Sequence, residues 1–205
     1  TTDLTLMNPE AITISVNLKF LGHGDSGLAG PERSFTLYPM SSVVLPDVLG
    51  SEFGLVSDWG PILVRTVTGA VVTQAQTSTP GGGGTYGQSV PAVARANAIT
   101  TTPRAICGIR QDSDFRTNIV LVNLAEQNAQ VDLLLMSSGG SALASIQETL
   151  GPLGFRQLNI ANNFGVSNVV GATLIVSSKS AQTPVAAYAS VIDNRTADPR
   201  TLLPQ

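Results

Sequence analysis

Few side chains in this sequence have types and spacing that could support catalysis. A Ser-His-Asp arrangement could use only His23, which is the single histidine and lies in the glycine-rich stretch Gly22–Asp25. Triad histidines are held by ordered neighbours, whereas such a stretch is typical of a solvated loop. The run Gly81–Gly84 lacks the Gly-Lys-Ser/Thr ending of a phosphate-binding loop and favours a hairpin tip. We therefore expect a protein that is not an enzyme and has no cofactor.

The acidic stretch Asp193–Pro199 is the best local candidate for a binding site. Aspartate and asparagine oxygens at this spacing can hold Ca²⁺, which makes Asp193 and Asp198 weak candidate metal ligands. The pattern of a helix-loop-helix calcium site is absent, however. An Asx turn in which Asp198 and Arg195 fix the loop is the more ordinary interpretation. We therefore expect no metal site.

The single cysteine, Cys107, limits the covalent chemistry of the chain. One cysteine excludes an intrachain disulfide, and one cysteine with one histidine excludes the usual zinc site. Cys107 lies in the apolar stretch Ala105–Ile109, which predicts a small buried hydrophobic residue.

The clearest feature of the sequence is a phrase that occurs twice. Thr2–Asn8 and Thr117–Asn123 are similar, and so are Val16–Phe20 and Val131–Leu135, both at an offset of 115 positions. Later matches drift only slightly: Phe53–Leu55 with Phe164–Val166, and Gly60–Arg65 with Gly171–Val176, each at an offset of 111. Offsets that change only at loops predict two copies of one domain.

Composition and periodicity favour β-structure in both copies. Charged residues make up 12% of the chain, while hydrophobic residues make up 42%. Apolar residues alternate with polar ones from Ile12 to Phe20, as in a strand with one face buried. The stretch Asp47–Leu55 could hold one helical turn, with Asp47 as its N-cap. About seven short strands in each copy predict small antiparallel β-sandwiches.

The two copies of the repeated phrase predict the domain organisation. We expect a first β-sandwich at 1–88, a connecting or leading strand segment at 89–115, and a second β-sandwich at 116–205. The first copy has no equivalent of the leading strand, because Thr1 aligns with Arg116. The chain also opens on Thr1 in mid-phrase, which favours a processed or trimmed product. The apolar residues of the connecting segment are candidate assembly contacts: Val90, Val93, Ile99, Ile106 and Ile109.

Two stretches of the second copy, Phe115–Asn123 and Tyr188–Pro199, resemble a poorly characterised family. It is a repeat found in tandem in secreted and surface proteins of bacteria, with a core phrase of the form Arg-Thr-Asp/Asn-hydrophobic-x-Leu-x-Asn. The resemblance implies an all-β fold of two tandem antiparallel immunoglobulin-like β-sandwich domains. It also implies an extracellular or cell-surface location, and it implies no catalytic residues.

Other classes of partner are disfavoured by charge and hydropathy. The net charge of −3 argues against a nucleic-acid binder. No apolar run approaches the ~18–20 residues of a membrane span, so we expect no membrane insertion.

Together these observations predict a non-enzymatic extracellular structural protein. It would be a subunit of a filament or surface assembly, its partners would be copies of itself, and contacts between β-strands of different subunits would hold the assembly. An adhesin-like or carbohydrate-binding module of a larger secreted bacterial protein is the alternative. A hydrolase, whose carboxylates would have to come from distant parts of the sequence, is a third possibility.

Overall fold

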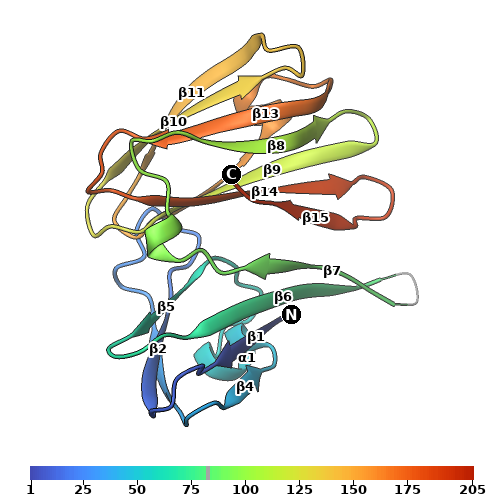
Figure 1. The fold of residues 1–205 in the computed structure, drawn as a ribbon. Helices are drawn as coiled ribbons and strands as arrows, with labels where there is room; N and C mark the ends of the chain where they lie inside the picture. Colours follow the sequence, from blue (N-terminus) through green and yellow to red (C-terminus); the bar gives the residue numbers. More distant parts are fainter. Residues whose placement is uncertain (82–83) are drawn as a thin grey trace. The chain divides into compact units, whose positions relative to one another are not determined.

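The computed structural model describes residues 1–81 and 84–205. The chain divides into two compact units. The first comprises Thr1–His23 and Ala29–Ala92, and the second comprises Gly24–Leu28 and Val93–Gln205. Nearly all regular structure is antiparallel β-sheet, which confirms the predicted all-β class (Figure 1). No helix in these ranges has the length and apolar character that a membrane span requires.

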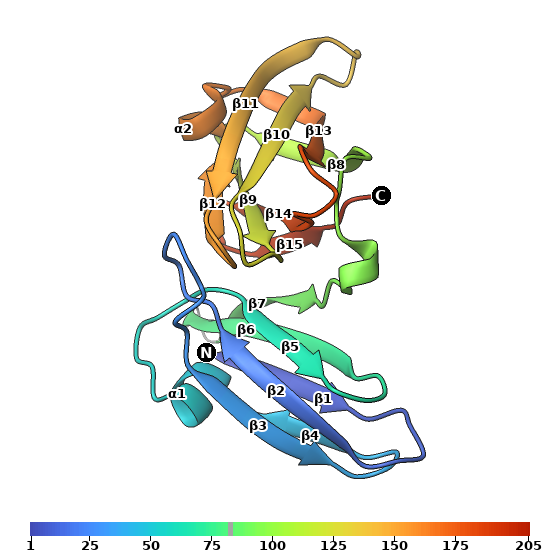
Figure 2. The ribbon, with the colours of Figure 1, turned by 90° about the vertical axis from the view of Figure 1, so that its left-hand side faces the viewer.

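The described residues of the first unit form two sheets. One sheet has the strand order β4-β1-β6-β7, and the other has the order β3-β2-β5 (Figure 2). The strands are β1 (Thr2–Met7), β2 (Ile14–Phe20), β3 (Glu32–Leu37), β4 (Ser42–Leu45), β5 (Ile62–Thr66), β6 (Val72–Gly81) and β7 (Gly84–Pro91).

The second unit also has two sheets, with the orders β12-β9-β14-β15 and β11-β10-β13-β8. Its strands are β8 (Arg104–Gln111), β9 (Phe115–Asn123), β10 (Ala129–Met136), β11 (Ala142–Leu150), β12 (Phe155–Asn159), β13 (Val169–Ser178), β14 (Val185–Asp193) and β15 (Pro199–Leu202). A short 3-10 helix, η1 (Arg95–Asn97), precedes β8 in the chain.

The strand orders of the two units correspond one to one, apart from β8. Strands β1 to β7 take the places of β9 to β15 in the same sequence, so β8 has no counterpart among the described strands of the first unit. This correspondence agrees with the two copies in the sequence. The duplication itself and the immunoglobulin-like type stay predictions.

The alternating patterns identify the buried faces correctly, and each unit has a sandwich-like core. In the first unit, buried residues such as Leu6 on β1 and Val16 and Leu18 on β2 come from both sheets. In the second unit, the equivalent residues Leu121 and Leu133 likewise come from facing sheets, and both are fully buried. Burial of aliphatic side chains between paired sheets is the main stabilising contribution.

Among the described residues, each unit has one short α-helix at the same place in the strand order. The predicted helical turn is confirmed as α1 (Val48–Phe53), and its counterpart is α2 (Ile160–Phe164). Asp47 stands at the N-cap of α1 but has a left-handed backbone, with φ 45°, and makes no capping hydrogen bond with its side chain. Asn159 does cap α2, because its side chain accepts hydrogen bonds from the next turn.

The same buried asparagine ties two turns together in each unit. The Nδ2 group of Asn8 donates to the carbonyls of Ile12 at 2.8 Å and Tyr38 at 2.9 Å. The Nδ2 group of Asn123 donates to those of Gln127 and Gly151, both at 2.7 Å. Both asparagines are fully buried, so these bonds satisfy polar groups that would otherwise lack partners.

One detail differs from the sequence expectations. Residues 89–91, grouped above with the connecting segment, continue strand β7 of the first unit. Strands β6 and β7 pair as far as Gly81 and Gly84, which confirms the predicted hairpin, while the tip residues 82 and 83 lie outside the described ranges. Residues 93–115 belong to the second unit, as expected for a leading segment.

Candidate functional site: an open sheet edge in the first unit

Strand β8 completes one sheet of the second unit. It pairs antiparallel with β13, placing Ile106 opposite Leu174 (Figure 1). It also packs against β9, β14 and β15 of the facing sheet, so it closes the side of the sandwich. Ile106 and Ile109 of β8 are fully buried in the core of this unit.

The corresponding sheet of the first unit ends at β5. In the order β3-β2-β5, this strand borders β2 on one side and has no strand neighbour on the other within the described residues (Figure 2). Leu18 of β2 pairs with Val64, just as Leu133 of β10 pairs with Val176. Val64 and Ile62 are therefore the structural counterparts of Val176 and Leu174.

These strand pairings correct the sequence alignment of β5 with β13. The sequence match at an offset of 111 would place Arg65 at the position of Val176. The ladders instead give an offset of 112 and place Val64 there. A shift by one residue exchanges the two faces of a strand, so only the corrected register identifies which β5 side chains face the core.

Side chains that β8 and the segment before it cover in the second unit stay partly exposed in the first. The partly exposed residues, here called the open edge, are Ile62, Val64, Val71, Thr73 and Ala75. Their counterparts are at most 2% exposed, and they are Leu174, Val176, Val185, Ala187 and Ala189.

The open edge thus lies where a fourth strand is present in the second unit. Full burial of a Val or Ile side chain contributes about 1.5–3 kcal/mol relative to full exposure, so covering these residues would recover part of that stabilisation. Edge strands also offer unpaired backbone groups as a template for another strand. Geometry and apolar surface therefore favour strand addition at β5.

Most of the candidate assembly residues from the sequence lie away from the open edge. Ile99, Ile106 and Ile109 are buried in the core of the second unit, where Ile99 forms a β-bridge with Val185. Val90 lies on β7, opposite Ala75 of the open edge. Val93 lies before η1, outside the strands, and is partly exposed. Their role in assembly stays a prediction, whereas their role within the chain is visible in these contacts.

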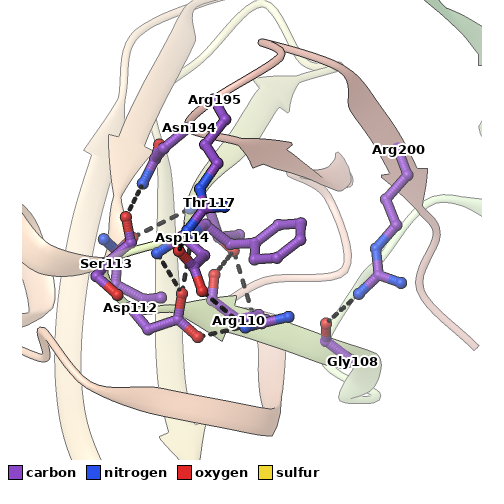
Figure 3. Close-up of polar contacts among 11 residues, drawn as sticks. Gly108, Arg110, Asp112, Ser113, Asp114, Thr117, Asn194, Arg195 and Arg200 are labelled. Carbon is purple, nitrogen blue, oxygen red and sulfur yellow. Dashed lines mark hydrogen bonds and ion pairs between the residues drawn. The ribbon is translucent and has the colours of Figure 1, made fainter.

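A polar network holds the turn between β8 and β9 (Figure 3). The Asp112 carboxylate accepts hydrogen bonds from Arg110 Nε at 2.6 Å and from the backbone N–H groups of Asp114 at 2.9 Å and Phe115 at 2.8 Å. The Arg110 guanidinium also lies 4.0 Å above the centre of the Phe115 ring, a cation–π contact. These contacts fix the point at which the chain leaves β8 and enters β9.

The same turn is linked to the loop between β14 and β15. Asn194 Nδ2 donates to the Ser113 carbonyl at 3.1 Å, and Arg195 Nη2 donates to Asp114 Oδ1 at 3.1 Å (Figure 3). Arg200 of β15 reaches the Gly108 carbonyl at 3.3 Å. The phrase that carried the family resemblance therefore holds β8 in place, a structural role for its Asp, Asn and Arg residues.

The predicted Asx turn is present, but a different aspartate forms it. Asp193 Oδ1 accepts from the backbone N–H groups of Arg195 at 2.7 Å and Thr196 at 3.0 Å, whereas Asp198 takes part through its backbone. The expectation that Asp198 fixes the loop was wrong, because Asp193 precedes the turn and so faces its free N–H groups. Within the described residues, no group of three or more His, Cys, Asp or Glu is placed to hold a metal ion.

Hydrogen bonds stabilise the charged forms of two of these carboxylates. The Arg110 side chain is the main cause that lowers the pKa of Asp112 below its ordinary value of 3.8, against an opposing effect of burial. The backbone N–H groups of Thr196 and Arg195 lower the pKa of Asp193 in the same direction. Both groups are therefore anionic at neutral pH and act as acceptors in the network.

His23 lies in a pairwise contact on the surface of the first unit. Its Nδ1 atom is 3.1 Å from Asp58 Oδ1, and its ring stacks on Trp59 with the centroids 4.9 Å apart. The side chain is half exposed, as expected for a loop histidine. A Ser-His-Asp triad also needs a nucleophile beside the histidine, and the described contacts of the His23 imidazole include none.

Cys107 is exposed, so the prediction of a buried cysteine was wrong. Side chains alternate along β8, and Ile106 takes the inward position before it. The ladder with β13 then shifts register, and Gly108 adopts a φ of +88°, which returns Ile109 to the core. The apolar run therefore contains a bulge, and a simple reading of its hydropathy places the cysteine on the wrong face.

Comparisons with known proteins add little to this picture. No protein-family model matches the chain, and no curated protein matches it. A crystal structure of Thermotoga maritima 1070 is similar over 52% of this chain and 94% of its own, with 10% sequence identity and a TM-score of 0.44. At this level the likeness says nothing about function.

Proposed function

We propose that this protein is a non-enzymatic structural subunit of an extracellular or cell-surface assembly, such as a filament, in which copies of the chain contact one another through β-strands. The observation that carries the proposal is the open edge. Within the described residues, β5 of the first unit has no strand neighbour on its outer side, and core positions whose counterparts are buried in the second unit stay partly exposed.

Three further observations support this function over an enzymatic one. The acidic loop, the best candidate for chemistry, serves to anchor β8. The chain is poor in charge, with 12% charged residues, and surfaces of this kind suit contact with other proteins. Several large hydrophobic side chains of the first unit are more than half exposed, among them Val67 at 93% and Tyr38 at 68%.

The test is self-association measured by sedimentation velocity over a series of concentrations, with electron micrographs of the same samples. We expect the wild-type chain to associate as concentration rises. The variant Val64→Lys places a charge facing inward on the edge strand, a known way to prevent strand addition, and should stay monomeric. Val67→Lys introduces the same charge at an exposed position just after β5 and should associate like the wild type.

Folding of the variants is checked by the fluorescence of Trp59, which is the only tryptophan and lies in the first unit. If the wild-type chain stays monomeric at high concentration and the micrographs show no polymer, the proposed function is wrong. Equal association of a folded Val64→Lys variant and the wild type would instead show that contacts away from β5 hold the assembly.

A further inference from the structure

The second unit includes five residues that come from the first copy of the repeat. Gly24–Leu28 follow β2 in the chain and belong to the second unit, whereas His23 and Ala29 on either side belong to the first. We propose that the turn at residues 151–154 is a docking surface for this segment, and that docking makes Gly24–Leu28 a stabilising part of the second unit. The inference goes beyond the proposed function, because it concerns a single chain and does not depend on assembly.

Hydrogen bonds to one carbonyl hold the segment on the turn. The Gly27 N–H donates to the Pro152 carbonyl oxygen at 3.0 Å, and the Ser26 hydroxyl donates to the same oxygen at 3.2 Å. Gly27 is buried, so this bond satisfies a backbone donor that would otherwise lack a partner. Arg156 Nη2 also lies 3.0 Å from Asp25 Oδ1, but both side chains are largely exposed and such pairs contribute little. Docking therefore depends chiefly on the backbone of the segment.

Two glycines of the turn make room for the segment. A Cβ atom at Gly151 would overlap the Asp25 carbonyl oxygen, and one at Gly154 would lie 2.6 Å from the same oxygen. Neither glycine has a φ in the left-handed region, so the backbone conformation of the turn does not itself require glycine. The close approach of the Asp25 carbonyl is therefore the physical reason for the absence of a side chain at both positions.

The equivalent turn of the first unit, at residues 38–41, lacks these features. Met40 and Leu153 occupy the same position and have the same left-handed backbone, with φ of 53° and 50°. Met40 is nevertheless 66% exposed, whereas Leu153 is 1% exposed. Tyr38 and Ser41 stand where the turn of the second unit has its two glycines. The two turns thus share a backbone conformation, and only that of the second unit is shaped to receive a segment.

Gly151→Ala tests docking in the full chain, with hydrogen exchange of the Gly27 amide as the measurement. The three atoms nearest to the added Cβ belong to Asp25 and Ser26, so the change acts on the segment and spares the rest of the second unit. We expect the Gly27 amide to be protected in the wild type and to exchange like an exposed loop amide in Gly151→Ala. Gly24→Ala is the matched control, because its added Cβ meets nothing within 4 Å, and it should keep the protection.

The slowest-exchanging amides of β13 report the stability of the second unit in the same experiment. Gly151→Ala should lower their protection by roughly 2–10-fold, as the loss of one backbone hydrogen bond predicts. Gly27→Pro removes the same bond from the side of the segment and leaves the turn intact, so it should have the same effect on β13. This second variant decides the question if Gly151→Ala does not fold. Gly24→Ala should leave the β13 amides unchanged.

The inference is overturned if the Gly27 amide of the wild type exchanges as fast as an exposed loop amide, or if it stays protected in a folded Gly151→Ala variant. It is also overturned if neither Gly151→Ala nor Gly27→Pro changes the β13 amides, because the segment would then contribute nothing to the second unit. All of these measurements are made on dilute protein. They are therefore independent of the self-association that tests the proposed function.

Discussion

Ile106 and Leu174 lie directly opposite each other across the β8–β13 ladder, and both side chains are fully buried. The position equivalent to Leu174 in the first unit is Ile62, which borders no strand on that side within the described residues and stays partly exposed. Among the described residues, the two units therefore differ in one strand, and the difference concerns the closure of a hydrophobic core.

The first prediction compares alanine substitutions at Ile106 and at Ile62. Ile106→Ala should lower the free energy of unfolding by about 2–5 kcal/mol, since it removes a fully buried side chain and leaves a cavity. Ile62→Ala should cost less than about 2 kcal/mol, because Ile62 is already partly in water. Chemical denaturation followed by circular dichroism, with Trp59 fluorescence for the first unit, measures both. Equal costs would show that Ile62 is as well covered as Ile106.

The second prediction concerns the buried asparagines. Asn8→Ala should destabilise the first unit by roughly 2–4 kcal/mol, because it leaves the carbonyls of Ile12 and Tyr38 and the N–H of Glu10 without their partners. Asn17→Ala is the control, since the side chain of Asn17 bonds only to exposed groups of Ser34 and Glu32 in the described contacts, and it should change stability by less than about 0.5 kcal/mol. A small effect at Asn8 would mean that water replaces its bonds.

The third prediction is the pH dependence that Asp112 gives to the second unit. The pKa of Asp112 is lowered chiefly by its hydrogen bond from Arg110. A carboxyl whose pKa is depressed on folding contributes stability at pH values above its ordinary pKa of 3.8. That contribution is lost as the pH falls through the lower folded value.

Hydrogen exchange at the β8–β9 turn checks this between pH 5 and pH 2, the range in which such carboxylates titrate. We expect protection of the turn to fall with pH in the wild type and to fall less steeply in Asp112→Asn. Trp59 fluorescence in the first unit should respond equally in both proteins. The same pH profile at the turn in both proteins would exclude Asp112 as the titrating group.

The fourth prediction follows from the bulge in β8. Cys107 is exposed, so a thiol reagent should modify it in the folded protein without denaturant. Modification should leave the unfolding midpoint nearly unchanged, since the side chain points away from the core. A thiol that reacts only after unfolding would mean that Cys107 faces the core of the second unit.

Much of the fold could be predicted from local pattern. Alternation of apolar and polar residues identifies strand β2 and its buried face, as Val16 and Leu18 show. The repeated phrase places Thr2–Asn8 at the position of Thr117–Asn123, and the sheet orders agree with this. These features depend on residue spacing within one strand, which a sequence displays directly.

Other features depended on pairing between strands. The sequence match at an offset of 111 aligned Arg65, instead of Val64, with Val176. The match arose because Gly60–Pro61 resembles Gly171–Ala172 in sequence, whereas the strand pairing places Gly60 at the position of Ala172. Cys107 is exposed because Ile106 before it faces the core, and a bulge opposite β13 then returns Ile109 to the core. The open edge itself is visible only when the burial of equivalent positions in the two units is compared.

The most direct test of the central claim is amide hydrogen exchange at Ile62–Thr66, measured on dilute protein and on assembled material. The account predicts that β5 amides exchange faster than those of β13 in the dilute chain and become strongly protected on assembly, while β13 changes little. Protection of β5 that is already equal to that of β13 in the dilute chain, or that does not rise on assembly, would contradict the claim that β5 receives a strand from a neighbour.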